Sequence, residues 1–169
     1  MFSDSIAEFI MTLTEWVAGL ESWQQLGALI LISAIPFVES YSGSFLGVLV
    51  GINPFVAVIA AVIGNTISTF ALIAGAGRAR TAVTGNGSEK ELTERQVRRR
   101  AKISKYFDRF GVPGVSLLGP LALPSQFTGP AMVALGASKR SVYFWMGISI
   151  IAWGVLFGFF SHLVVDWIY

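Results

Sequence analysis

The sequence predicts an all-α integral membrane protein with two inverted repeats, each a re-entrant helical hairpin followed by a transmembrane helix. Three observations predict this class. Hydrophobic residues make up 54% of the 169 residues and charged residues only 13%, which is about half the charged share of a soluble domain. Two apolar stretches, residues 26–52 and 112–137, are each interrupted by Pro and Gly near the middle. All twelve Lys and Arg residues lie between Arg78 and Arg140. We expect a single membrane domain over residues 1–169.

The N-terminal segment, residues 1–22, is predicted to contain an amphipathic helix. Apolar residues recur there at helical spacing, and the acidic residues Asp4, Glu8, Glu15 and Glu21 occupy the other positions. This acidic, two-faced pattern is typical of a helix that lies at the membrane interface. A short first transmembrane helix is the alternative.

Residues 23–77 are expected to form the first hairpin and its span. A helix of about 12 residues covers roughly 18 Å, whereas the hydrocarbon core is about 30 Å thick. Neither half of the interrupted stretch is therefore long enough to cross, and broken helices at membrane depth must be buried in protein or line a cavity. Pro36 and Gly43 are predicted to shape this hairpin, and residues 54–76 to span the membrane.

Residues 78–110 are predicted to be a cytoplasmic basic segment, because short loops rich in Lys and Arg stay on that side. Arg98, Arg99 and Arg100 are expected to face anionic lipid headgroups. No other feature of the chain supports a nucleic-acid-binding fold. The localisation that follows is a bacterial-type cytoplasmic (inner) membrane, crossed more than once.

The second hairpin and span are expected within residues 111–169. Residues 111–138 lie between two basic stretches and should therefore enter and leave the membrane on the cytoplasmic side. Three residues are predicted to shape this hairpin: Pro120, Pro124 and Gly129. Residues 142–165 are the second predicted span, with interfacial aromatic residues at both ends.

A shift of 85 residues aligns Ser40 with Ser125 and Gly51 with Gly136. This correspondence favours inverted repeats, the arrangement of alternating-access carriers, in which the substrate site lies where two hairpin tips meet. Chance similarity between two apolar segments rich in Gly and Pro is the alternative.

Glu39 is the only acidic residue inside an apolar segment, and it is the central candidate for function. An ionised carboxylate near the bilayer centre costs about 2.5–3.5 kcal/mol, so Glu39 is expected to exchange a proton or to bind substrate. The other candidate binding residues are Ser40, Tyr41, Asn65, Ser125 and Gln126. The alternative is a structural carboxyl that satisfies the free backbone groups of its own hairpin.

No catalytic, metal or cofactor site is predicted. The chain has no cysteine and one histidine, and its carboxylates are scattered, so no metal-ligand spacing occurs. Neither a nucleophile elbow nor a phosphate-binding glycine loop is present, and an enzyme is therefore not expected.

Four motifs stand out in the second half of the chain: Tyr106-Phe107-Asp108-Arg109-Phe110-Gly111, the Gly119/Pro124/Gly129 hairpin, Ala131-Met132, and Trp153 with Gly154 and Gly158. Together they resemble the DedA/VTT superfamily. The stretch from Pro36 to Ser40 is similar to the small multidrug export branch of that superfamily. The resemblance implies movement of lipids or lipid-linked phosphates, or proton exchange, through two opposed re-entrant hairpins, with Glu39 as the acidic residue of the first. The chain departs from the family pattern at Leu121 and Phe127, where DedA members carry arginines that suit a phosphate.

Three functions follow as hypotheses. The first is a proton-coupled carrier or exporter of small amphipathic or cationic compounds. The second is a lipid or lipid-phosphate flippase or scramblase of the same architecture, and the third is a non-transporting membrane scaffold. The expected partners are membrane lipids, protons and a small-molecule or lipid substrate. A homodimer through the Gly154/Gly158 or Ala60/Gly64 face is compatible with these small residues.

Overall fold

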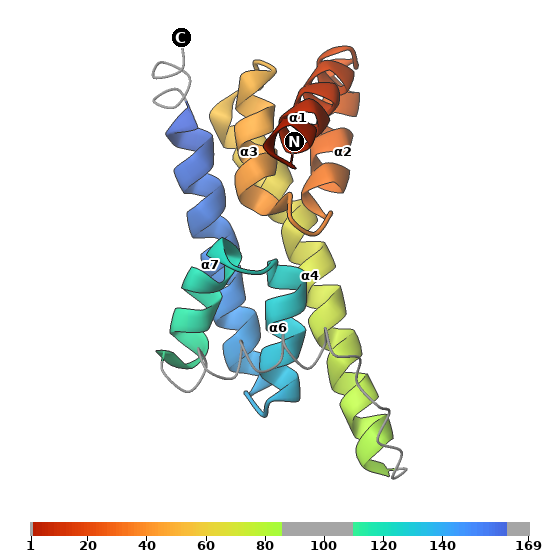
Figure 1. Ribbon diagram of the computed structural model, residues 1–169, viewed down its shortest axis with the longest axis vertical. Helices are drawn as coiled ribbons and strands as arrows, with labels where there is room; N and C mark the ends of the chain where they lie inside the picture. Colours follow the sequence, from red (N-terminus) through yellow and green to blue (C-terminus); the bar gives the residue numbers. More distant parts are fainter. Residues whose placement is uncertain (1, 86–109, 162–169) are drawn as a thin grey trace. The chain divides into compact units, whose positions relative to one another are not determined.

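The computed structural model describes residues 2–85 and 110–161, and this part of the chain is helical, without a strand (Figure 1). The labelled α-helices are α1 (Phe2–Ala18), α2 (Ser22–Ser33), α3 (Glu39–Leu49), α4 (Pro54–Gly85), α6 (Ser125–Ala134) and α7 (Lys139–Phe159), with a 3-10 turn at Gly119–Leu121. Residues 110–118 are also helical. The predicted all-α class is confirmed for the described residues. Two helical segments are long and apolar enough to cross a membrane, Pro54–Ala76 and Lys139–Phe159.

The chain forms two compact units. Unit 1 is Met1–Thr66 with Ile150–Tyr169, and unit 2 is Ile67–Ser149. The boundary between them falls inside α4 and inside α7. Each unit therefore contains one part of each long helix together with one pair of short helices, and unit 1 also contains α1.

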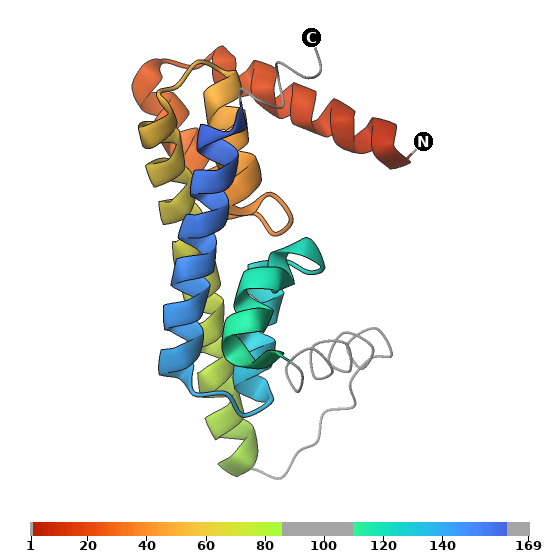
Figure 2. The same cartoon turned by 90° about the vertical axis from the view of Figure 1, so that its left-hand side faces the viewer.

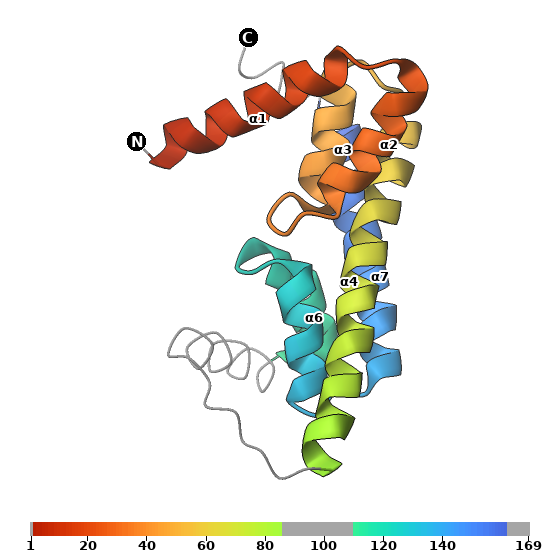
Figure 3. The ribbon, with the colours of Figure 1, turned by 90° about the vertical axis from the view of Figure 1, so that its right-hand side faces the viewer.

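In unit 1, α3 packs against α2 and against the first part of α4 (Figure 3). A Cβ added at Gly47 would lie 2.7 Å from the Cβ of Ala57 and 2.8 Å from Cδ1 of Leu29, so only glycine leaves room for this contact. One turn earlier in α3, Gly43 faces Ser33 and Ala61 in the same way. Small residues at these positions let the helix backbones approach closely.

The first part of α4 also packs against the last part of α7, and the two run antiparallel. The rings of Phe55 and Phe159 are 4.7 Å apart between centroids. Further along α4, Val62 lies against Gly154, which precedes Phe159 in the sequence. Ascending residue numbers in one helix thus meet descending numbers in the other.

Helix α1 leaves the α2–α3 pair at a steep angle (Figures 2 and 3). Its C-terminal end is anchored by Val17, which is fully buried and packs with Leu13 and Leu20 in the core of unit 1. Glu8 and Glu15 lie on exposed positions of this helix. A helix in the predicted N-terminal segment is therefore confirmed.

In unit 2, α6 packs against the second part of α4 and the first part of α7. A Cβ added at Gly129 would lie 2.8 Å from Cδ1 of Ile73 in α4 and 3.8 Å from Cε of Met146 in α7. The buried core of this unit is apolar and includes Val115 from the helix at 110–118. Helix α6 thus contacts both long helices, as α3 does in unit 1.

The junction that leads from α3 into α4 recurs 85 residues later between α6 and α7. Gly51 and Gly136 each have a left-handed backbone, with φ of 85° and 108°, which glycine adopts without strain. The N–H of Ile52 donates to the carbonyl of Gly47 at 3.0 Å, and the N–H of Ala137 donates to that of Met132 at 3.0 Å. Both short helices therefore end in a Schellman-type turn.

The beginnings of the long helices also correspond. Asn53 caps α4 by accepting a bond from the N–H of Phe55 at 3.0 Å, and Ser138 caps α7 by accepting one from the N–H of Ser141 at 3.2 Å. The six buried residues described in α7 all have a buried counterpart in α4 at this shift. The pairs are Ala57/Val142, Ala61/Met146, Gly64/Ser149, Asn65/Ile150, Thr69/Gly154 and Ile73/Gly158.

Some predicted positions need correction. Gly43 and Gly129, which were expected to shape hairpin turns, lie inside α3 and α6, where their missing side chains allow helix contact. The second long helix begins at Lys139 instead of residue 142, because the side chain of Ser138 caps it. Arg98, Arg99 and Arg100 lie outside the described residues, as does most of the predicted basic segment.

Candidate functional site

The turn between α2 and α3 holds two non-glycine residues in the left-handed region, Phe37 with φ of 77° and Glu39 with φ of 55°. Pro36 immediately precedes them, and the N–H of Glu39 donates to the carbonyl of Ile35 at 3.3 Å. Left-handed backbone at such residues costs about 1–3 kcal/mol each and persists only where surrounding contacts impose it. Strain of this kind is concentrated at functional sites.

Glu39 is 1% exposed, whereas Phe37, two residues before it, is 63% exposed. Among the side chains that the structure describes, Glu39 is the only buried one that carries a formal charge when ionised. The turn thus directs an apolar ring outward and a carboxyl inward. Burial of an ionised carboxyl without compensation would cost several kcal/mol, so the interior around Glu39 has to supply interaction partners for it.

The packing of α3 on α4 gives the surroundings of this carboxyl. Gly47 meets Ala57, and one turn back Gly43 meets Ala61. Continuing by one further turn in each helix leads from Gly43 to Glu39 and from Ala61 to Asn65, because residues four apart share a helix face. Asn65 is 1% exposed. The helix register therefore directs both polar side chains to one level of unit 1.

A row of buried serines extends from Glu39 along the same unit. The hydroxyl of Ser40 donates to the carbonyl oxygen of Ile150 in α7 at 2.8 Å. Ser44 lies one turn further, beside Gly154 and Gly158 of α7. The Oγ atoms of Ser33 and Ser44 are buried and have no hydrogen-bond partner among the described residues. Unit 1 therefore contains more buried polar groups than its own protein bonds satisfy.

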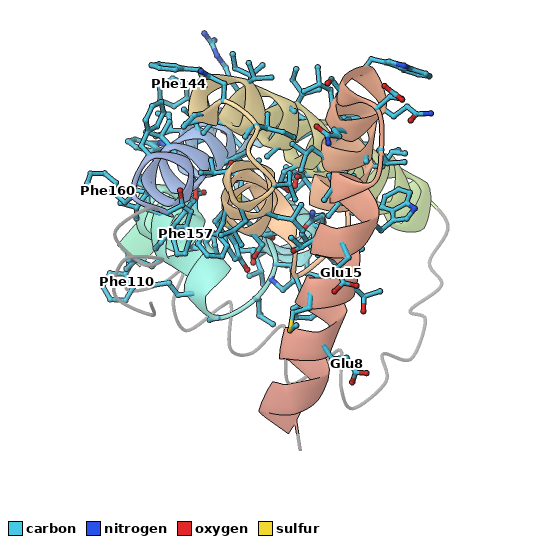
Figure 4. All side chains as sticks on the ribbon, turned by 90° about the horizontal axis from the view of Figure 1, so that it is seen from above. Glu8, Glu15, Phe110, Phe144, Phe157 and Phe160 are labelled. Atoms are coloured by element: carbon cyan, nitrogen blue, oxygen red, sulfur yellow. The ribbon has the colours of Figure 1, made fainter. Side chains whose placement is uncertain are left out.

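Tyr41 follows this row but faces a different neighbour. Its hydroxyl donates to the carbonyl of Phe37 at 3.2 Å, and its ring lies 5.6 Å from that of Phe157. Phe157 also lines an apolar cavity of about 170 Å³ with Phe45, Leu156, Phe160 and Ser161. Figure 4 shows Phe157 and Phe160 on the α7 side of the unit.

Unit 2 has its own buried polar cluster at the beginning of α6. Ser125 Oγ lies 3.0 Å from Thr69 Oγ, and Gln126 Nε2 donates to Ser68 Oγ at 3.2 Å. Ser125 and Gln126 are each 1% exposed. Pro124 precedes the helix and removes one backbone donor there, while its carbonyl accepts from the Thr128 hydroxyl at 3.0 Å.

The candidate residues from the sequence thus fall into two groups. Glu39, Ser40, Tyr41 and Asn65 belong to unit 1, and Ser125 with Gln126 belongs to unit 2. Seven further buried polar residues among those described were not among the predicted candidates: Ser33, Ser44, Thr69, Ser116, Thr128, Ser149 and Ser161. The spacing of Ser40 and Ser44 by one helical turn could have indicated the polar face of α3. The described residues contain no group of three or more His, Cys, Asp or Glu suited to a metal.

Comparison with protein-family models, with curated proteins and with solved structures finds no match to this chain. Function must therefore be inferred from the chain's own composition, packing and buried groups.

Proposed function

We propose that this chain is a multi-pass membrane transport protein of DedA-like architecture, which carries small amphipathic or cationic compounds in exchange for protons bound at Glu39. The observation that carries the proposal is the buried carboxyl of Glu39 on a left-handed backbone, in the turn between two short helices. A buried carboxyl of this kind can bind and release a proton, or take up a cation in its place.

The exposed face of α4 supports a lipid environment. Phe55, Ile59, Ile63 and Ile67 recur every four residues and are 65%, 59%, 42% and 61% exposed. The opposite face carries small residues that contact α2 and α3, and the small residues at its contact with α7 are Gly154 and Gly158 of α7. Such a helix, apolar toward its surroundings and small toward its neighbours, is typical of a membrane bundle. The absence of Lys and Arg before Arg78 and after Arg140 supports the same assignment.

Helix lengths support re-entrant hairpins. α2 and α3 have 12 and 11 residues, and α6 has 10. At 1.5 Å per residue none of them covers a hydrocarbon core of about 30 Å. A pair of such helices that enters and leaves on one side, with its polar turn buried in protein, meets the requirement that backbone groups be satisfied.

The recurrence at 85 residues supports inverted repeats. Both halves have a short helix, a left-handed glycine, a capping side chain and a long helix at this shift. Because the two long helices pack antiparallel in unit 1, equivalent halves would have opposite directions across a bilayer. This is the arrangement on which alternating access is built.

The turn residues favour a cation over a phosphate. Neither Ile35 to Val38 nor Leu121 to Pro124 includes Lys or Arg, and Leu121 is 69% exposed. A lipid phosphate would need such a donor to compensate its charge. Lipid transfer and a scaffold role are therefore outcomes of the following test.

The test uses purified protein in liposomes that contain a pH-sensitive dye, with tetraphenylphosphonium as the probe. Substrate-dependent proton movement is expected for the wild type and is expected to be lost in Glu39→Gln. Glu15→Gln is the matched control, because Glu15 lies on the outer surface of α1 (Figure 4), and it should retain full flux. Flux in Glu39→Gln equal to that of the wild type would reduce Glu39 to a structural role. Absence of flux in all three folded proteins would refute the carrier, and lipid scrambling would then be measured in the same vesicles.

A further inference from the structure

Two buried serines occupy equivalent places in the two halves of the chain. Ser40 and Ser125 are 85 residues apart, and each lies at the beginning of a short helix and is 1% exposed. Ser40 Oγ donates to the carbonyl oxygen of Ile150 in α7 at 2.8 Å. Ser125 Oγ lies 3.0 Å from Thr69 Oγ in α4. Ser40 thus joins α3 to α7, and Ser125 joins α6 to α4. In each case the short helix is bonded to the long helix of the other half of the chain.

Packing around the serines repeats this exchange. A Cβ added at Gly158 in α7 would lie 3.3 Å from the Cβ of Ser44 in α3. At the equivalent place in unit 2, a Cβ added at Gly129 in α6 would lie 2.8 Å from Cδ1 of Ile73 in α4. Ser44 and Gly129 are 85 residues apart, as are Ile73 and Gly158. The hydrogen bonds therefore belong to two equivalent helix contacts.

We propose that Ser40 and Ser125 are paired positioning residues of a two-state cycle, in which each hydrogen bond holds one helix pair against the long helix of the opposite half. The inference rests on the proposed function only in requiring that two such states exchange. Helices α4 and α7 each extend through both units, so the two hydrogen bonds act on the same pair of long helices. Two states that exchange must lie close in free energy, and we expect each of the two hydrogen bonds to contribute to that balance.

Loss of one of the two hydrogen bonds should therefore change the accessibility of the α2–α3 turn and of the turn before α6 in opposite directions. A buried neutral hydrogen bond of this kind changes an equilibrium by about 2- to 10-fold. Ser40→Ala should release the α2–α3 turn and secure the turn before α6. Ser125→Ala should do the reverse. A serine that merely stabilised its own unit would affect only the turn beside it.

The chain has no cysteine, so single cysteines can be introduced without background labelling. Ile35→Cys reports on the α2–α3 turn and Leu121→Cys on the turn before α6, at positions that are 43% and 69% exposed. Each reporter would be reacted with a membrane-impermeant maleimide in sealed proteoliposomes, from either side. Ser40→Ala is expected to raise the rate at Ile35→Cys and lower it at Leu121→Cys by about 2- to 10-fold, and Ser125→Ala to do the opposite.

Threonine at either position keeps the hydroxyl and should restore wild-type rates. Ser42→Ala, at a half-buried serine of the same helix, is the control that should change neither rate. A change confined to the reporter beside the mutated serine, a rise at both reporters, or no change would overturn the inference. If Ser40→Ala does not fold, Ser125→Ala tests the same coupling with both reporters.

The labelling requires neither substrate nor a proton gradient. Opposite shifts in protein that moves no protons would retain the paired anchors and refute the carrier. Proton flux through Glu39 together with purely local labelling changes would retain the carrier and refute the paired anchors.

Discussion

Replacement of Gly64 by alanine tests whether α2 and α4 are held at the close distance that the structure shows. A Cβ at this position would overlap the carbonyl oxygen of Ile30 and lie 2.8 Å and 3.0 Å from its carbonyl carbon and Cα. Ordinary carbon contacts are about 3.5–4.0 Å, so α2 would have to retreat by about 1 Å. All three neighbouring atoms belong to the backbone, and no side-chain rotation can relieve the overlap.

The expected magnitude follows from two opposing effects. Overpacking costs about 1–3 kcal/mol, and a rigid backbone neighbour places this site near about 3 kcal/mol. The better helix propensity of alanine returns about 1 kcal/mol, which leaves a net loss of about 2 kcal/mol. For a chain of this size that loss lowers the apparent Tm by about 4–8 °C.

Gly75→Ala is the matched control in the same helix, because a Cβ there would meet nothing within 4 Å. It keeps the propensity gain without the clash, so its apparent Tm should rise by about 2–4 °C. Thermal unfolding in detergent, followed by far-UV circular dichroism, would measure both variants. A Gly64→Ala protein as stable as Gly75→Ala would refute the close contact between α2 and α4.

Three smaller effects are expected from the same kind of measurement. Gly51→Ala should cost about 1–2 kcal/mol through its left-handed backbone alone, whereas Gly51→Asn should cost less because asparagine tolerates that region; equal Tm values would contradict this. Gly129→Ala should cost about 1 kcal/mol, since the atoms that it meets are the flexible end of Ile73, and Ile73→Val should recover part of that loss; no recovery would argue against the contact. Ser149→Ala should cost about 1 kcal/mol, because its buried hydroxyl donates to the carbonyl of Ser116 at 2.7 Å, and an unchanged Tm would mean that this bond contributes no net stability.

Much of the local structure was predictable from the order of residues. Composition and apolar periodicity predicted the helical class, and residues 54–76 were recognised as a candidate span because an uninterrupted apolar run of that length has few other uses. The alignment of Gly51 with Gly136 by an 85-residue shift was also visible. Helix formation and glycine turns depend mainly on neighbours within a few residues, so the sequence is enough to predict them.

Other features were decided only by the tertiary structure. Pro36 lies in the α2–α3 turn as expected, but Gly43 lies inside α3, because its role is to let Ser33 and Ala61 approach. The partners of Ser40 and Ser125 could not be read from the sequence either, since each bond joins residues more than fifty positions apart. Local periodicity determines which face of a helix is small or polar. Which helices meet at that face depends on how all of them pack together, and that packing gives Ser40 and Ser125 their partners.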